Sequence, residues 1–185
     1  CICEKPLTLR PWNIDGLSSV SQSADKKVFT ILQLRLHESV IALKRQVEDQ
    51  LKSDPNHIFD VELTYITSRG NWYYASWKGD EEKSGGIATN IGVHFFDMLH
   101  WIFGPLQQQK VHARSHDRAS GVLRFKNANV RWFLSINAAT LPEKVVQSGG
   151  RIHRSLRFDQ WSFDFTEGFT ELHSRSYAHI LNDKG

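Results

Sequence analysis

The sequence predicts an α+β fold in which helices cover one face of an open, mainly antiparallel sheet. The first observation is the order of the elements, because strand and helix patterns alternate early and then give way to a meander of short strands. The second is the stretch from Ser84 to Gly104, in which a mostly apolar and therefore buried helix begins at about Thr89. With 185 residues, of which 40% are hydrophobic, the chain can bury a core of its own.

The first part of the chain alternates strand and helix patterns. It opens on the end of a buried strand that breaks into a turn at Pro6. A helix is predicted over Pro11–Ala24, and β-branched and apolar residues predict a strand over Val28–Leu36. The clearest helix is Glu38–Ser53, whose apolar residues repeat at intervals of three and four, and an alternating strand follows over His57–Ser68.

After the central helix the chain has the pattern of antiparallel strands. Short turns join neighbouring runs, as in hairpins. The last segment has an apolar face and predicts a helix. The predicted strands are Val111–Arg118, Gly121–Lys126, Val130–Asn137, Arg151–Phe158 and Trp161–Phe165, and the final helix is Glu171–Leu181.

Four residues put a polar stripe on the central helix. Asn90, His94, Asp97 and Trp101 follow one another at steps of four, three and four, which places them on a single face. A polar stripe on a buried helix costs stability unless each group has a partner, so it is either an internally satisfied network or the lining of a site. The two adjacent glycines before the helix, and the charged, aromatic loop that precedes them, favour a site.

That loop, from Arg69 to Lys83, carries four aromatic residues and several charges. Aromatic residues with polar tips suit both an oligomer contact and a lid over a ligand, and the sequence leaves these two alternatives equal. Arg151, Arg154 and Arg157 also cluster, and their strand-like spacing favours a solvated face.

Composition and charge exclude several classes of function. The net charge of +3 comes from basic residues scattered among 20 acidic ones, which is no nucleic-acid footprint. No apolar run of about 18 residues predicts a membrane span. Cys1 and Cys3 are too close to bridge readily and lack the second pair of a zinc site, which suits a reducing cytoplasm. No metal site is expected, because His94, Asp97 and a distant His37 lack diagnostic spacing.

Several motifs resemble the Gfo/Idh/MocA family, named for glucose–fructose oxidoreductase, inositol dehydrogenase and rhizopine catabolism. The motifs are Glu4-Lys5-Pro6, Gly85-Gly86 and Gly92-x-His94-x-x-Asp97-x-x-x-Trp101-x-x-Gly104. Residues 32–37, 69–73, 76–80 and 170–177 resemble a branch of the family that oxidises the 3-hydroxyl of UDP-N-acetylglucosaminuronic acid for lipopolysaccharide and other surface-polysaccharide biosynthesis.

The resemblance implies a domain organisation and a cofactor. Its members are NAD(P)-dependent sugar dehydrogenases with a Rossmann-type nucleotide domain followed by an α+β substrate domain. Residues 1–36 are then expected to be the end of the nucleotide domain, and residues 37–185 most of the substrate and oligomerisation domain. Because residues 1–185 hold no G-x-G-x-x-G motif, the NAD fingerprint is expected outside them, and this fragment is expected to be inactive alone.

The resemblance also implies roles for single residues. Lys5 matches the lysine beside the nicotinamide and the reacting hydroxyl, and His94 matches the histidine assigned to proton transfer. Asn90 stands where the family often has aspartate, and it can bond a sugar hydroxyl but cannot accept a proton. Asp97 is expected to orient the imidazole of His94. The other expected contacts are Glu4 with the cofactor and, with Asn90 and His94, Arg35, Arg69, Trp72, Tyr73, Trp77 and Lys78 with the substrate.

The chemistry requires a base, and histidine has a suitable pKa without perturbation, whereas the pKa of a lysine must be lowered by burial or a nearby cation. Lys5, His94 and Asn90 are expected at one cavity. Two alternatives stay open: another sugar or polyol dehydrogenase of the family, and a non-catalytic sugar-nucleotide binding or assembly module, which Asn90 favours. A homodimer or homotetramer is expected through the antiparallel sheet, because its strands 121–125 and 131–135 carry large apolar residues on both faces.

Overall fold

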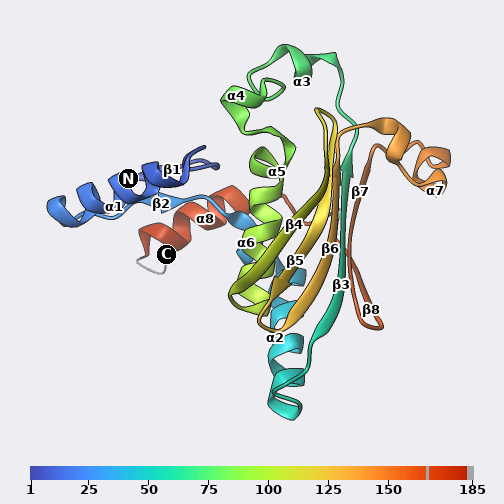
Figure 1. The fold of residues 1–185 in the computed structure, drawn as a ribbon, viewed down its shortest axis with the longest axis horizontal. Helices are drawn as coiled ribbons and strands as arrows, with labels where there is room; N and C mark the ends of the chain where they lie inside the picture. The colour runs from blue at the N-terminus through green and yellow to red at the C-terminus, as the bar shows by residue number, and fades with distance from the viewer. Residues whose placement is uncertain (166, 183–185) are drawn as a thin grey trace.

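Helices lie on one side of a six-stranded sheet in the computed structural model, which describes residues 1–165 and 167–182 (Figure 1). The strand order is β4-β5-β6-β3-β7-β8, and neighbours are antiparallel except for the parallel pair β3 and β6. This confirms the predicted α+β fold with an open, mainly antiparallel sheet. The strands are β3 Phe59–Thr67, β4 Leu106–Arg114, β5 Arg118–Phe125, β6 Ala128–Ser135, β7 Ile152–Phe158 and β8 Trp161–Asp164.

The hydrophobic core lies between the sheet and the helices α2 (Glu38–Ser53) and α6 (Gly92–Phe103). Alternate residues of the central strands face these helices, because side chains along a strand point to opposite sides. Leu63 of β3, Leu134 of β6 and Met98 of α6 are all almost completely buried there. The predicted helix over residues 38–53 is confirmed with the same bounds, and its apolar stripe packs against this core.

The predicted central helix is two helices in the structure. A short helix, α5 (Gly86–Asn90), ends where Ile91 turns the chain, and α6 begins at the next residue. Gly92 permits this restart, because a Cβ there would lie 2.6 Å from the ring of Phe96. The break matters for the site, because it leaves the main-chain carbonyl of Asn90 available to a side chain.

The first residues form a small parallel unit of their own. Strand β1 (Ile2–Cys3) pairs with β2 (Phe29–Thr30), and α1 (Pro11–Ala24) connects them, as predicted for that helix. The predicted strand over residues 28–36 is wrong beyond Thr30, because Pro6 lies soon after β1 and the longer strand has no partner to pair with. The chain instead closes on itself in the 3₁₀ helix η1 (Gln33–Leu36).

The remaining elements are short. The predicted loop over residues 69–83 contains α3 (Asn71–Ala75) and leads into α4 (Glu81–Ser84). After β6 come η2 (Ala138–Thr140) and α7 (Glu143–Gln147), and α8 (Leu172–Leu181) packs against η1. Within the described residues, no helix combines the length and the apolar character needed to cross a bilayer.

The outer face of the sheet, away from the helices, carries ion pairs. Arg131 of β6 bonds Glu62 of β3 at 3.1 Å, and Arg157 of β7 pairs with the other oxygen of Glu62. Val122 and Phe133 also lie on this side and are half-buried, but Val122 stands beside Arg131 in the strand register. The expected large apolar patch is therefore wrong, because charged side chains divide this face.

Candidate functional site

A cavity of about 200 Å³ brings Lys5 and His94 together. Lys5 follows the carboxyl end of β1, His94 lies in the first turn of α6, and Arg69 follows the end of β3. In open α/β sheets, the carboxyl ends of strands are where ligands bind. The lining residues are Lys5, Gln33, Leu34, Tyr65, Arg69, Ile91, His94, Phe95, Arg154 and Phe169.

Lys5 is held from behind by Asn90. Its Nζ donates hydrogen bonds to the main-chain oxygen of Asn90 and, at 3.1 Å, to the side-chain Oδ1. The Nδ2 of Asn90 in turn donates to the hydroxyl of Tyr73 at 3.4 Å. Asn90 and Tyr73 are each 3% exposed, and neither lines the cavity. The expectation that Asn90 lies on the cavity wall is therefore wrong, and the expected contact of both residues with the substrate stays a prediction.

The environment of Lys5 and His94 changes their proton affinities. Burial lowers the pKa of Lys5, the positive charges of Lys78 and Arg69 lower it further, and Glu4 opposes the shift. Burial, with a smaller contribution from Lys5, lowers the pKa of His94 to about 3, so the imidazole is neutral at neutral pH. The Nδ1 of His94 is buried without a hydrogen-bond partner among the described residues. The pKa of His94 is therefore shifted, whereas the sequence led us to expect an unperturbed pKa for this histidine. Lys5 is the stronger base of the two.

The cavity carries a positive field. Lys5, Arg69 and Arg154 contribute cations to its lining, in which no aspartate or glutamate occurs among the residues that the structure describes. The guanidinium of Arg154 lies over the rings of Tyr65 and Phe169, with its central carbon 5.3 and 4.2 Å from the ring centres. Such a cavity attracts an anionic group.

Asp97 does not orient His94, contrary to the expectation. Its carboxylate forms a bidentate pair with Arg35, from Nε to Oδ2 at 2.8 Å and from Nη2 to Oδ1 at 2.5 Å. The predicted polar stripe thus divides, because Asp97 and Trp101 are held by cations from other elements. For Trp101 that cation is Lys44, which bonds its carbonyl at 3.1 Å and lies over its ring. Arg35 is engaged in this pair and does not line the Lys5 cavity.

The other residues expected to bind ligands lie around the cavity. Trp72 and Trp77 are 57% and 50% exposed, on the loop segment beside it. Lys78 lines a separate small cavity but is near enough to lower the pKa of Lys5. Glu4 points to His173, with 3.5 Å between its Oε1 and Nε2 of the ring. Of the predicted set, Lys5, Arg69 and His94 are the members among the described residues that line the cavity, and Asn90 bonds Lys5 without lining it.

Seven lining residues were missed from the sequence: Gln33, Leu34, Tyr65, Ile91, Phe95, Arg154 and Phe169. Arg154 was assigned with Arg157 to a solvated face, but residues three apart on a strand point to opposite sides. Arg157 faces outward to Glu62, whereas Arg154 faces inward beside Tyr65, its partner in the β3–β7 register. The odd spacing is the signal that could have separated the two arginines.

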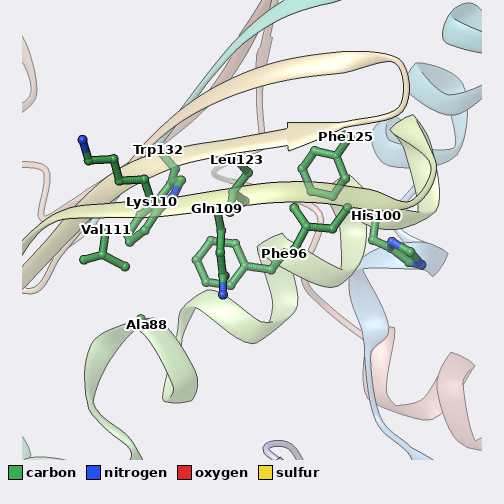
Figure 2. Close-up of a pocket in the computed structure, with 10 residues that line it drawn as sticks. Ala88, Phe96, His100, Gln109, Lys110, Val111, Leu123, Phe125 and Trp132 are labelled. Atoms are coloured by element: carbon green, nitrogen blue, oxygen red, sulfur yellow. The ribbon is translucent and has the colours of Figure 1, made fainter.

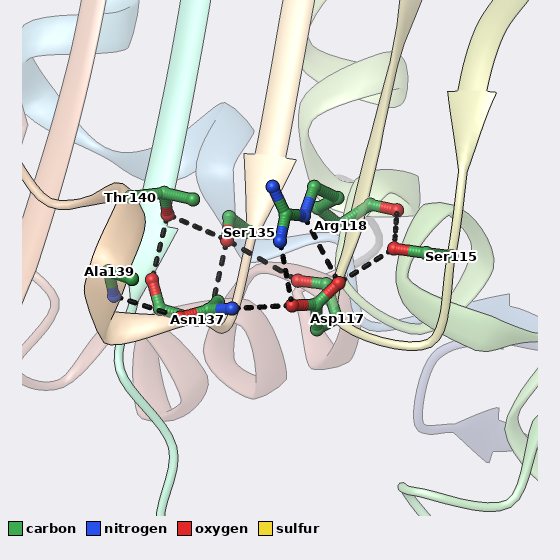
Figure 3. Close-up of polar contacts among 7 residues, drawn as sticks. All are labelled: Ser115, Asp117, Arg118, Ser135, Asn137, Ala139 and Thr140. Carbon is green, nitrogen blue, oxygen red and sulfur yellow. Dashed lines mark hydrogen bonds and ion pairs between the residues drawn. The ribbon is translucent and has the colours of Figure 1, made fainter.

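A buried carboxylate, that of Asp117, lies in a cluster of hydrogen bonds with Ser115, Arg118 and Asn137 (Figure 3). Arg118, with Ser115 and Asn137, holds the pKa of Asp117 well below its usual range, and Asn137 Nδ2 lies 2.6 Å from the carboxylate. The main-chain oxygen of Asp117 accepts from the amide of residue 136, whose own oxygen accepts from the Arg69 amide at 3.1 Å. The Asp117 carboxylate is thus occupied by three side chains, and its main chain supports the backbone that leads to Arg69.

A larger, mostly apolar cavity of about 280 Å³ lies between α6 and β4 (Figure 2). His94 and Phe96 are two residues apart on α6, so they leave the helix on nearly opposite sides, and Phe96 lines this second cavity. In Figure 2, Gln109 points from β4 toward Phe96, and His100 stands at one end. The cavity contains none of the residues predicted to act in catalysis.

The described residues contain no group of three histidine, cysteine, aspartate or glutamate side chains arranged to hold a metal ion. His37, considered above as a distant ligand, instead caps α2 through Nδ1 and bonds the carbonyl of Glu167 through Nε2. Cys1 and Cys3 are free thiols.

The fold and a family match define the C-terminal α/β domain of an oxidoreductase. The chain belongs to the Gfo/Idh/MocA family, because the family description "Oxidoreductase family, C-terminal alpha/beta domain" matches residues 56–153, more than half of the chain. A curated relative, an uncharacterized oxidoreductase of Synechocystis sp., is 32% identical over 111 residues, which are 57% of this chain and 28% of that protein.

Two solved structures of the WlbA (WbpB) dehydrogenase from Thermus thermophilus resemble the chain over its whole length. The complex with NAD and alpha-ketoglutarate is 44% identical with a TM-score of 0.93, and the complex with NAD and UDP-GlcNAcA is 43% identical with a TM-score of 0.92. Both alignments cover 100% of this chain and 58% of that protein, so the chain spans little more than half the length of these relatives.

Proposed function

We propose that the polypeptide carrying this sequence is an NAD-dependent dehydrogenase that oxidises the 3-hydroxyl of UDP-N-acetylglucosaminuronic acid. The observation that carries the proposal is the cavity in which Lys5 lies with a neutral histidine and two arginines. The similarity to a dehydrogenase bound to NAD and UDP-GlcNAcA supports both the cofactor and the acidic substrate. The cations argue against a free polyol, which has no charge for them to bind.

The residues present fit the nicotinamide end of NAD. Glu4 and Lys5 follow a parallel strand whose neighbour is reached through a helix, which is the arrangement that places dinucleotides at strand ends. NAD, when bound, supplies the acceptor for the hydride. The glycine-rich turn that binds its pyrophosphate does not occur in residues 1–185, so Glu4 and Lys5 would contact only one end of it.

The proton of the substrate hydroxyl passes to Lys5 in this proposal. Burial and neighbouring cations lower the pKa of Lys5, so a larger fraction of the amine is neutral near neutral pH than for a free lysine. His94 is neutral and its ring lines the cavity, where it can bond a sugar hydroxyl and hold it in place. Arg69 and Arg154 bind the acidic part of the substrate.

The test is cofactor reduction by the whole polypeptide that carries this sequence. UDP-N-acetylglucosaminuronic acid should give NADH, whereas myo-inositol and UDP-N-acetylglucosamine should give little. Lys5→Met should lower kcat by about 10²–10⁴-fold, the range for loss of a general base, and Lys52→Met, at an exposed lysine, should leave it unchanged. Equal turnover of the inositol and the sugar acid would contradict the proposal.

We also propose that the polypeptide acts in the cytoplasm, in surface-polysaccharide synthesis, as a homodimer or homotetramer. The outer face of the sheet supports the oligomer, because Figure 1 shows no helix packed over it among the described residues. Its Arg131–Glu62–Arg157 ion pairs would give such a contact charge specificity. Light scattering of the whole polypeptide tests this, and a monodisperse monomer at micromolar concentration would contradict it.

A further inference from the structure

We propose that Tyr73 and Asn90 form a positioning pair, in which Tyr73 fixes the amide of Asn90 so that both Asn90 oxygens accept hydrogen bonds from the Lys5 amine. The inference rests on the proposed role of Lys5 as proton acceptor. It concerns two buried residues that do not line the cavity.

The break between α5 and α6 makes this arrangement possible. Asn90 is the last residue of α5, and the chain turns at Ile91 before the next helix begins. The main-chain oxygen and the side-chain Oδ1 of one residue therefore both face the Nζ of Lys5. A continuous helix would direct that carbonyl along its axis to an amide one turn later.

The two acceptor oxygens of Asn90 determine the direction of the lone pair on the Lys5 amine. A neutral lysine amine has two N–H bonds and one lone pair. When both N–H groups bond Asn90, the lone pair is directed away from Asn90. Lys5 lines the cavity and Asn90 does not, so that direction is into the cavity, where the substrate hydroxyl must give up its proton. The proton then resides on Nζ and makes the ammonium.

Tyr73 selects which end of the amide faces Lys5. An asparagine side chain has an acceptor oxygen on one side and a donor NH₂ group on the other, and only the oxygen can accept from Lys5. The Nδ2 group instead donates to the Tyr73 hydroxyl at 3.4 Å, a long hydrogen bond. Burial raises the pKa of Tyr73, so its hydroxyl stays neutral. The ring is fixed by edge contacts with Trp72 and Tyr74, each with 5.8 Å between ring centres.

The pair orients Lys5 without adding charge. The charged groups that act on Lys5 are Lys78, Glu4 and Arg69, and Arg154 lines the same cavity. Asn90 is neutral, as are Tyr73 and His94 at neutral pH. A carboxylate in place of the amide would stabilise the Lys5 ammonium and withdraw the base, whereas the amide supplies the same two acceptors and leaves the amine available.

The experiment measures the protonation of Lys5 directly. Trace acetylation with acetic anhydride at a series of pH values, read by peptide mass spectrometry, gives the midpoint of Lys5 reactivity in the chain, with the exposed Lys52 as internal reference. Asn90→Asp should raise the midpoint by about one unit or more. Tyr73→Phe should lower it, because the freed amide can turn its NH₂ group toward the ammonium. Tyr74→Phe, on the same helix but 43% exposed, is the matched control and should change nothing.

The decisive arm combines the two substitutions. A carboxylate has two equivalent oxygens and needs no orientation, so Tyr73→Phe should have no further effect in the Asn90→Asp background. A Tyr73→Phe shift of equal size in both backgrounds would mean that Tyr73 only packs, and an unchanged midpoint in Asn90→Asp would mean that residue 90 does not act on Lys5; either result overturns the proposal. If Asn90→Asp fails to fold by circular dichroism, the comparison of Tyr73→Phe with Tyr74→Phe decides.

Turnover separates this inference from the proposed function. In the whole polypeptide, Tyr73→Phe should lower kcat by roughly tenfold with little change in KM, because misplacing a catalytic group slows the chemical step. Loss of all sugar-acid turnover in the unaltered protein, together with the expected acetylation midpoints, would reject the proposed function and retain the positioning pair.

Discussion

Arg35 and Asp97 join two parts of the chain that the sequence places 62 residues apart, through two parallel hydrogen bonds between guanidinium and carboxylate. Arg35 belongs to η1, next to the parallel unit of β1 and β2, and Asp97 lies in the middle of α6. The pair therefore fixes the first residues, including Lys5, against the helix that carries His94.

We expect Asp97→Asn to lower the free energy of unfolding by about 1 kcal/mol, a value reduced from that of a buried pair because the Arg35 side chain is 41% exposed. Urea unfolding measures the change. Asp49→Asn is the control, because Asp49 forms its pair with Lys52 in full solvent, with side-chain exposures of 72% and 76%. Equal effects of the two substitutions would contradict a joining role for Asp97.

The neutral state of His94 predicts how stability depends on pH. The pKa of His94 is about 3 in the folded chain and near 6.5 in an unfolded one. Between these values the unfolded chain binds a proton that the folded chain does not, so stability is complete above about pH 6.5 and falls as the pH is lowered. The slope should be about 1.4 kcal/mol per pH unit. His94→Gln should remove it in urea unfolding, and His112→Gln, at an exposed histidine, should keep it.

Arg154 predicts how the cavity recognises an anion. We expect Arg154→Gln to weaken binding of UDP-N-acetylglucosaminuronic acid by roughly 10- to 100-fold, as for the loss of a charged hydrogen bond, and to leave binding of UDP alone unchanged. Isothermal titration of the whole polypeptide measures both. Arg157→Gln is the matched control, because Arg157 lies on the same strand and faces outward. A similar loss of affinity for UDP would place Arg154 at the nucleotide instead.

The position of Gly168, next to the cavity residue Phe169, is predicted to require glycine. Its φ is +85°, and a Cβ there would lie 2.6 Å from Nε2 of His37, the residue that caps α2. Gly168→Ala should therefore cost about 1–3 kcal/mol in urea unfolding, through backbone strain and through displacement of the His37 ring. Gly149→Ala supplies the control, because its φ of +74° carries the strain but nothing lies within 4 Å of the added Cβ. Equal costs would show that strain alone acts at Gly168.

Local sequence patterns predicted where helices and strands lie better than they predicted which strands pair with one another. The helix over residues 38–53 and the strand alternation of the sheet follow from the spacing of apolar residues, which is a property of adjacent sequence. The strand expected over residues 28–36 is shorter in the structure, because its length depends on how far its partner β1 extends. Pro6, far from this strand in the sequence, limits the length of β1.

The candidate site was predicted in part for the same reason. Lys5 and His94 carry recognisable motifs, and the fold brings them to one cavity. The partner of Asp97 was assigned to the nearest histidine, although an arginine from a distant element forms a stronger bidentate pair. Tyr73 was expected to face a ligand because it lies in a charged loop with three other aromatic residues, but its burial is decided by packing that the loop sequence does not encode.

Strand β4 forms one edge of the sheet, and all nine of its residues are exposed. Its pairing with β5 shifts register twice, between Leu106 and Gln108 and again between Val111 and Ala113. Such irregularities twist an edge away from the flat geometry that another strand would need, and the charge of Lys110 adds to that effect. A strand from another copy of the protein therefore cannot pair regularly with β4. At high protein concentration, this edge of the sheet should not start the growth of a fibril.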